Sequence, residues 1–184
     1  MQFLENIDTE ILVFIHNNFT GPFMDKLMTK VTFMGNAGCI WIVIGLILAL
    51  SSRYRKYGFM VIGSLIFCFV IGNLGLKPLV ARARPYNFNE FITLLIDAPL
   101  DYSFPSGHTM TSFASACILY YMNKKVGVIA YALATTIAFS RLYLYVHYPS
   151  DVLVGLIISL FISKIVIKIT EILENEDKFK KIKI

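Results

Sequence analysis

Five apolar runs, each close to the length of a membrane-crossing helix, are the feature that most restricts how this chain can fold. They lie at about residues 37–51, 57–76, 106–121, 126–145 and 149–168. A helix needs roughly 20 predominantly apolar residues to cross a hydrocarbon core of about 30 Å. With 57% hydrophobic residues and a mean hydropathy of +0.66, the chain is far more apolar than a soluble domain, whose surface must be wetted. We therefore expect an all-α fold, a polytopic transmembrane helix bundle of about five spans.

The N-terminal segment differs from the rest because its apolar stretches also carry charges. In residues 7–19, Asp8, Glu10 and His16 alternate with apolar positions at helical spacing, and the stretch is too short and too charged to cross a membrane. Gly21-Pro22 ends it and begins a second amphipathic helix. No Lys or Arg precedes the first apolar stretch, so we expect no cleavable signal peptide. The chain then divides into an interfacial helical N-terminal segment, a membrane-embedded core and a charged cytoplasmic tail, at residues 1–36, 37–170 and 171–184.

Basic residues beside the apolar runs indicate how the spans are oriented. Lys and Arg flank the spans in the 53–56 loop, at Lys124-Lys125 and in the tail at 178–183, and the alternation of spans places all three on one side. The positive-inside rule makes this side cytoplasmic, so the 77–106 and 145–151 loops face the outside of the cell. We expect a multi-pass plasma-membrane protein with these loops extracytoplasmic. The same distribution accounts for most of the net charge of +5, so we expect no binding of nucleic acid.

Cysteines and carboxylates do not have the spacing of a metal site in this sequence. Cys39, Cys68 and Cys117 all lie inside apolar runs without paired spacing, and we expect them to be small core residues. No carboxylate cluster suited to a divalent cation stands out. We therefore expect neither a metal nor another cofactor.

The first of three polar blocks at the ends of apolar runs contains Lys77 and Arg84. They are seven residues apart, or two helical turns, so on a helix they would share a face; Pro78 and Pro85 make an irregular path equally compatible. On either path both cations can reach one anion, to which Arg offers a planar fork and Lys a compact charge. On a helix, Arg82 would point away from that anion. For this block alone, cations that snorkel at a span end are the alternative interpretation.

The second block is Pro105-Ser106-Gly107-His108. Pro and Ser mark a helix start, Gly lets the backbone approach a ligand closely, and the N–H groups of the first turn point outward, which together make a cradle for an anion. His108 lies beside this cradle and can donate a proton to a departing oxygen, because imidazole titrates near working pH. A plain capped helix with a histidine explains this block equally well when it is considered alone.

The third block is the most specific. Asp151 follows His147 by four residues, so its carboxylate can hold one imidazole nitrogen and leave the other free to attack phosphorus. Arg141 precedes His147 by six residues and adds a cation, whereas we interpret the neighbouring Ser140 as a helix-packing residue. A lone His and Asp at a span end would indicate only that the span meets water there. Three polar blocks on one predicted face indicate a phosphate-handling site instead.

Together the blocks resemble the signature of the type 2 phosphatidic acid phosphatase family. That signature is Lys, six residues, Arg-Pro; then Pro-Ser-Gly-His; then Ser-Arg, five residues, His, three residues, Asp, and every position matches between Lys77 and Asp151. The helical hydropathy around the signature looks like the small bacterial branch of the family. The resemblance implies the fold core shared by this family and the haloperoxidases, and a metal-independent phosphohydrolase that works through a phosphohistidine.

The resemblance also implies a role for each matching residue. His147 would be the nucleophile, Asp151 would orient and charge it, and His108 would protonate the leaving oxygen. Five further residues would hold the phosphoryl oxygens: Lys77, Arg84, Ser106, Gly107 and Arg141.

These expectations favour a lipid phosphatase or diphosphatase that acts at the outer membrane surface. Undecaprenyl diphosphate, hydrolysed to undecaprenyl phosphate, fits an outward-facing site because in bacteria its recycling is required on that side. Phosphatidylglycerol phosphate and phosphatidic acid are the alternatives within the family. Vanadium haloperoxidases resemble the same pocket but are large and soluble. A lipid or anion transporter would need polar groups deep within the spans, where Asn73 is the only obvious candidate.

Overall fold

The computed structural model describes the backbone of residues 2–89 and 92–182 and the side chains of residues 4–89 and 92–175. Every regular element within these ranges is a helix, which confirms the predicted all-α class. The elements in chain order are α1 (Gln2–Phe19), α2 (Pro22–Gly35), η1 (Asn36–Gly38), α3 (Cys39–Leu50), α4 (Arg55–Cys68), η2 (Phe69–Leu76), α5 (Lys77–Val80), η3 (Pro85–Phe88), α6 (Gly107–Met122), α7 (Lys124–Tyr143) and α8 (Pro149–Ile182).

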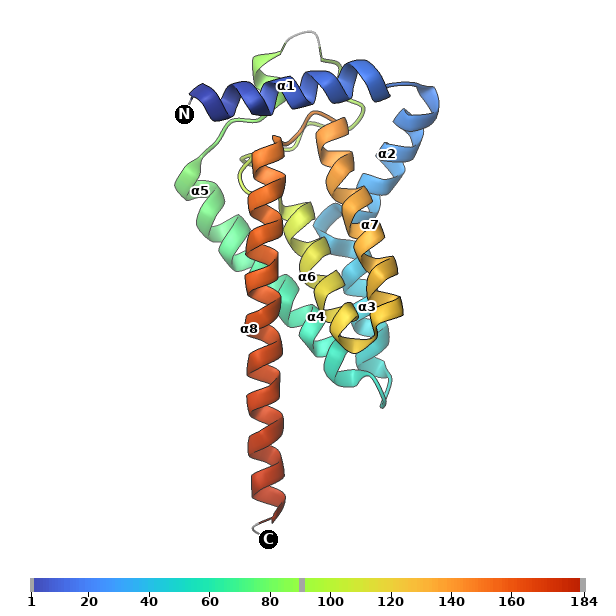
Figure 1. Ribbon diagram of the computed structural model, residues 1–184, viewed down its shortest axis with the longest axis vertical. Helices are drawn as coiled ribbons and strands as arrows, with labels where there is room; N and C mark the ends of the chain where they lie inside the picture. Colours follow the sequence, from blue (N-terminus) through green and yellow to red (C-terminus); the bar gives the residue numbers. More distant parts are fainter. Residues whose placement is uncertain (1, 90–91, 183–184) are drawn as a thin grey trace.

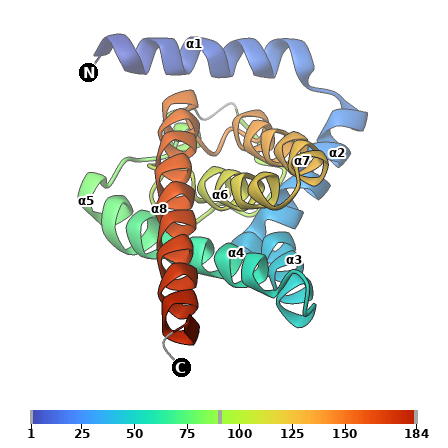
Figure 2. The same cartoon turned by 60° about the horizontal axis from the view of Figure 1, so that its bottom comes forward.

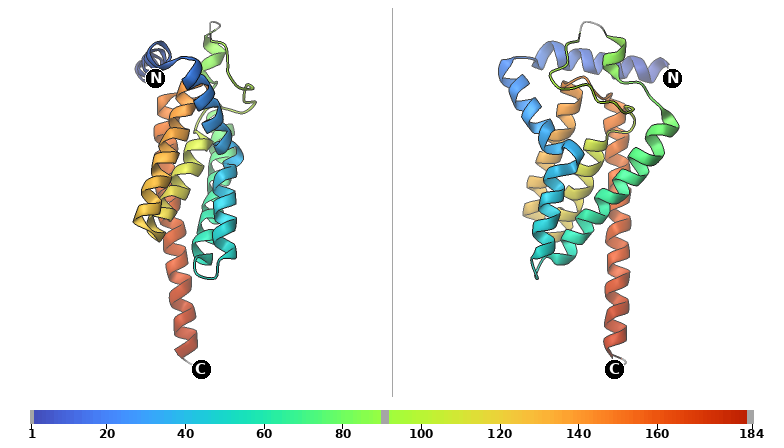
Figure 3. Two further views of the ribbon diagram at one scale, coloured as in Figure 1. Left: turned by 90° about the vertical axis from the view of Figure 1, so that its right-hand side faces the viewer. Right: turned by 180° about the vertical axis from the view of Figure 1, so that it is seen from behind.

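The helices form a bundle that is covered at one end by α1 (Figure 1). α1 lies across this end, whereas α3, α6, α7 and α8 run along the bundle and α8 extends beyond the others. Figure 2 shows α6 between α7, α8 and α4, the three helices that it contacts most. Seen from behind, α4 and the helical turns after it cross the bundle obliquely and lead up toward the end covered by α1 (Figure 3).

The hydrophobic core is centred on α6. Met110, Ala114 and Ile118 recur every four residues along one side of this helix, and all three are fully buried. Its polar positions are also matched, because the buried Trp41 donates a hydrogen bond of 2.9 Å from its Nε1 to the Oγ of Ser112. The start of α6 is therefore held firmly in place at the covered end of the bundle.

Four helical stretches are long and apolar enough to cross a membrane, at residues 22–50, 55–88, 124–143 and 149–175. α6 has 16 residues, fewer than the roughly 20 that a span needs, and it lies in the middle of the others. The expectation of about five spans therefore stays a prediction. The first stretch begins at Pro22 because η1, where Ala37 has a φ of 51°, only kinks the path from α2 into α3.

The three cysteines are not all core residues. Cys68 is buried and Cys117 is half-buried, as expected, whereas Cys39 is exposed. The expectation for Cys39 is wrong because this residue begins α3, just after the kink, where its side chain is left exposed. All three are free thiols.

Candidate active site

The three polar blocks lie at α5 and the segment after it, at the start of α6, and between the end of α7 and the start of α8, toward the end of the bundle that α1 covers. There they surround a cavity of about 1580 Å³. Six of the residues predicted from the sequence line it: Lys77, Arg84, Gly107, His108, Arg141 and His147. The other two, Ser106 and Asp151, are fully buried beside it.

His147 lies in the turn between α7 and α8 with its imidazole buried. Its Nδ1 is 3.6 Å from Oδ2 of Asp151, an electrostatic contact slightly longer than a hydrogen bond. Oδ2 also accepts hydrogen bonds from the Tyr148 N–H, at 2.9 Å, and from the Ser103 hydroxyl. The carboxylate therefore stands on the Nδ1 side of the ring, and Nε2 is left on the side of Arg84, whose Nη1 is 3.3 Å away.

The surroundings of His147 keep its ring neutral. Burial, which disfavours the charged form, lowers the pKa of His147 to about 3; Asp151 opposes the shift and Arg84 and Arg141 add to it. Neutral imidazole is the form whose free nitrogen can attack an electrophile. One ring nitrogen of His147 is therefore unprotonated at neutral pH.

Arg141, near the end of α7, is a buried cation with unused hydrogen-bonding capacity. Its Nη1 donates to the hydroxyl of Thr32 on α2, but its buried Nε–H has no protein partner among the described residues. A buried N–H without a partner is costly, and a phosphate oxygen in the cavity would satisfy it. Thr32 belongs to the N-terminal segment, outside the sequence signature.

Lys77 and Arg84 also face the cavity, although not from one helix. α5 ends at Val80, and Ala81, with a φ of 49°, turns the chain onto an irregular path, which is the second of the two predicted alternatives. Both cations bind the carboxylate of Asp101: Lys77 through Oδ2 and Arg84 through Oδ1 at 2.5 Å. Asp101 thus places two anionic oxygens where a phosphate would be expected to bind.

Asp101 is a residue that the sequence reasoning missed, and its only signal is an acidic side chain in the loop between two cationic blocks. Its burial alone would raise its pKa, but the hydrogen bonds and charges of Lys77 and Arg84 outweigh this effect and hold the pKa of Asp101 at about 2. The carboxylate is therefore ionised at neutral pH and competes with any other anion for the same two cations.

We expect Asp101→Asn to bind inorganic phosphate more tightly than the unchanged protein, by on the order of 10-fold, because the competing charge is gone. The measurement is the inhibition constant of phosphate. Asp97→Asn removes another carboxylate that lines the cavity but forms no ion pair with Lys77 or Arg84, so it is the matched control and should leave this constant unchanged. Weaker phosphate binding in Asp101→Asn would mean that this carboxylate organises the two cations instead of competing for them.

The second block begins α6 as predicted. Ser106 is the N-cap, and its hydroxyl accepts from the Thr109 N–H at 3.5 Å and from the Thr109 hydroxyl at 2.9 Å. His108 reaches across to the N-terminal segment, where its Nε2 is 3.0 Å from Oδ1 of Asn36. The ring packs closely on α2, since a Cβ added at Gly35 would lie 2.7 Å from its Cδ2. His108, at the start of α6, is therefore held by residues outside the signature.

Arg82 and Ser140 do not line the cavity. Arg82 lies on the irregular path after α5, where the helix-based prediction does not apply, and makes ion pairs with Asp8 and Asp151. The Ser140 hydroxyl is buried and donates to the Ile137 carbonyl at 2.6 Å, which agrees with a packing role. Among the described residues, no three His, Cys, Asp or Glu side chains gather in a group that could hold a metal.

Fold and site together define a multi-pass helical membrane protein with a cationic, histidine-containing pocket at one end of its bundle. The model of the PAP2 superfamily matches residues 53–173, a region that contains all three polar blocks. The chain belongs to the PAP2 superfamily, which confirms the resemblance found in the sequence.

Relatives and solved structures support this membership. An undecaprenyl-diphosphatase of Sulfolobus acidocaldarius is 32% identical over 131 residues, which cover 71% of this chain and 63% of that protein. A lipid A 4′-phosphatase of Bacteroides thetaiotaomicron is 31% identical over 175 residues, or 88% of this chain and 76% of the relative. The crystal structure of a transmembrane PAP2 type phosphatidylglycerolphosphate phosphatase from Bacillus subtilis has a TM-score of 0.76, covering 93% of this chain and 88% of that one at 23% identity, and shows a shared fold. The relatives are thus hydrolases named for lipid phosphates.

Proposed function

We propose that this protein is a lipid phosphatase that works through a phosphohistidine on His147. The observation that carries the proposal is the geometry of this residue: its neutral imidazole has Asp151 on the Nδ1 side and three buried cations around the cavity on the other. A nucleophile placed beside cations can attack a phosphate whose charge would otherwise repel it, and the same cations stabilise charge in the transition state.

The reaction would run in two steps. In the first, Nε2 of His147 forms a bond to phosphorus, the bond from phosphorus to the leaving oxygen breaks, and a protonated His108 donates a proton to that oxygen; the negative charge of a phosphate bound beside the ring favours this protonated form. In the second, water attacks the phosphohistidine, His108 takes a proton from it, and inorganic phosphate and the free imidazole are released. Throughout, Asp151 stabilises the charge that the ring acquires on bonding to phosphorus.

Five residues would hold the phosphoryl oxygens during both steps: Lys77, Arg84, Arg141, Gly107 through its N–H, and Ser106. Arg141 has the free Nε–H for this task. The Ser106 oxygen accepts from Thr109, which leaves its own O–H free to donate to a phosphoryl oxygen.

The shape of the cavity supports a lipid substrate. Beyond the cationic end, its walls are apolar side chains of α3, α4 and η2, including Ile42, Leu46, Leu65 and Phe69. Such walls suit hydrocarbon chains better than a sugar or a nucleoside, because apolar surface gains from contact with other apolar surface. A headgroup could therefore reach His147 while its tails remain between the helices.

Undecaprenyl diphosphate is the substrate that we propose first, with phosphatidylglycerol phosphate and phosphatidic acid as alternatives. The relatives' names support a lipid phosphate and divide over which one. Purified protein should be assayed in parallel on these three lipids, with EDTA present, for released phosphate. The proposal expects the highest kcat/KM on the isoprenyl diphosphate. A preference for a glycerophospholipid would transfer the assignment to that lipid, and no release from any of them would contradict phosphatase activity.

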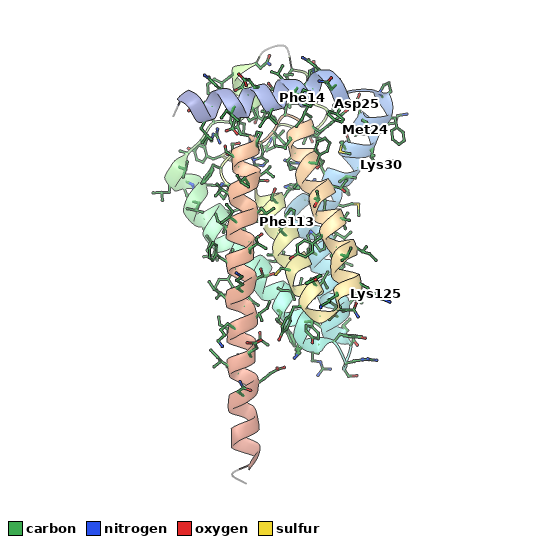
Figure 4. The ribbon with its side chains drawn as sticks, viewed as in Figure 1. Phe14, Met24, Asp25, Lys30, Phe113 and Lys125 are labelled. Carbon is green, nitrogen blue, oxygen red and sulfur yellow. The ribbon has the colours of Figure 1, made fainter. Side chains whose placement is uncertain are left out.

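We further propose that the site faces the outside of the cell. Lys125 lies at the end of the bundle opposite Phe14 and Asp25, which mark the covered end (Figure 4). The basic loop at 53–56 joins α3 to α4, at the same end as Lys125 (Figure 1). By the positive-inside rule, that distal end is cytoplasmic.

To test this orientation, we expect a cysteine at the fully exposed position Leu100, in a background with the three native cysteines replaced by alanine, to react with an impermeant maleimide in intact cells. A cysteine at the exposed Ser52, at the opposite end, is the matched control and should react only after permeabilisation. The reverse pattern would place the site in the cytoplasm and remove the argument for an outward-facing carrier lipid.

A further inference from the structure

Asp8 is a buried carboxylate on a helix that is otherwise largely exposed. Only 1% of its surface is accessible, whereas its neighbours Ile7, Thr9 and Glu10 are exposed. A carboxylate is costly to bury unless it is paired and hydrogen-bonded. The family match begins at residue 53, so Asp8 belongs to a part of the chain to which the signature assigns nothing.

Asp8 uses its carboxylate to join two segments of the site. Oδ1 accepts from the backbone N–H of Ser150, in the first turn of α8, at 2.9 Å. Oδ2 accepts from Nη2 of Arg82 at 2.7 Å and from the Ser150 hydroxyl. The polar contacts of Asp8 therefore lie immediately next to Asp151 in the chain and in space.

Arg82 links the two carboxylates. Its Nη1 donates to Oδ1 of Asp151 at 2.6 Å and to the Ser150 hydroxyl at 2.7 Å, while its Nη2 is held by Asp8. The guanidinium also lies 3.9 Å above the ring of Tyr148. An unbroken series of polar contacts thus runs from Asp8 through Arg82 to Asp151, whose other oxygen faces His147.

We propose that Asp8 is a positioning residue for the Asp151–His147 pair, an inference that rests on the proposed phosphohistidine mechanism. A guanidinium prefers to bind a carboxylate with two parallel hydrogen bonds. Because Asp8 occupies Nη2, only Nη1 of Arg82 is available to Asp151, which keeps its Oδ2 directed at the imidazole. Without Asp8, both nitrogens of Arg82 become available to Asp151 and compete with the Tyr148 N–H and the Ser103 hydroxyl for its Oδ2, which draws this oxygen away from the ring that it must orient.

The consequence is that α1 supports the chemistry as well as covering the end of the bundle. Loss of the Asp8 carboxylate leaves the phosphate-binding residues in place, because Lys77, Arg84 and Arg141 make no hydrogen bond or ion pair with it. Turnover should therefore fall while phosphate binding stays the same. If Asp8 only anchored α1, its loss would change turnover and phosphate binding together.

The test measures kcat, KM and the inhibition constant of inorganic phosphate for Asp8→Asn. We expect kcat to fall on the order of 10- to 100-fold, as is typical when a supporting partner of a functional residue is lost, with both other constants within about twofold. Glu10→Gln removes a charge from the exposed face of the same helix and should match the unchanged protein. Arg82→Lys keeps the positive charge but lacks the two guanidinium nitrogens that bind Asp8 and Asp151. It tests the same contacts if Asp8→Asn fails to fold. In the double variant, which combines Asp8→Asn with Arg82→Lys, the two losses in kcat should not multiply, because both substitutions break the same series of contacts.

Unchanged kcat in Asp8→Asn, equal losses in kcat and phosphate binding, or multiplying losses in the double variant would each overturn the proposal. His147→Ala in the same assay separates this failure from that of the mechanism. An inactive His147→Ala beside a fully active Asp8→Asn removes only the role of Asp8, whereas an active His147→Ala removes the phosphohistidine mechanism itself.

Discussion

His147→Ala is expected to abolish phosphate release, with a loss on the order of 10⁴-fold or more in kcat, while the protein still folds and inserts. No neighbouring side chain can replace the imidazole as nucleophile. The Ser103 hydroxyl lies 3.5 Å from Nδ1, on the side of Asp151, and Ser103 does not line the cavity. The measurement is phosphate release from a detergent-solubilised lipid substrate by purified protein.

Two companion variants make this result specific. Asp151→Asn should also be severely impaired, because an amide cannot stabilise the charge that the ring acquires when it bonds to phosphorus. His16→Ala removes the same kind of side chain from α1, outside the cavity, and should retain activity. Phosphate release at the unchanged rate from a folded His147→Ala protein would contradict a phosphohistidine.

His108→Ala is expected to lower kcat by on the order of 10²- to 10⁴-fold, the usual contribution of a general acid, with a much smaller effect on apparent substrate affinity. The reason is that Lys77, Arg84 and Arg141 still hold the phosphate. The loss should shrink for an aryl phosphate with an acidic phenol, because that leaving group departs without a proton. The comparison of the two substrates on one variant isolates the proton transfer.

The contacts of His108 also fit a role in positioning or folding, which the same assay can detect. Its ring packs against Gly35 and meets Asn36, so it contributes to the contact between α6 and the N-terminal segment. Equal losses on the lipid and on the aryl phosphate, at matched binding, would show that His108 serves positioning or folding. An effect on affinity alone would remove it from the role of general acid.

The helices themselves were predictable from local signals. The apolar runs and the Gly21-Pro22 break depend only on residues close together in sequence. In the structure, α1 ends just before this break and α2 begins at Pro22. The N-cap role of Ser106 and the packing role of Ser140 have the same local origin. The position of Cys39 was not predictable, since hydropathy alone does not tell the side of a helix that faces its neighbours from the side that faces outward.

Which residues meet at the site could also be predicted, because the signature residues are close in sequence within each block. Asp151 follows His147 by only four residues, so the short turn into α8 is enough to bring the carboxylate beside the imidazole. That the three blocks share one cavity followed from the expectation that they lie at the same ends of neighbouring spans, and the structure places six of the eight predicted residues on its walls.

By itself, therefore, the sequence determined an all-helical membrane bundle, its family and the residues that meet around one cavity at the end covered by α1. Only the tertiary structure decided that Asp8 binds Arg82 and that Asp101 pairs with Lys77 and Arg84. It also decided which residues of the N-terminal segment contact Arg141 and His108. The physical reason is that helix periodicity and capping relate residues within a turn or two. Contacts between residues 74 or 109 positions apart arise only when the packing of the helices has set which ends lie together.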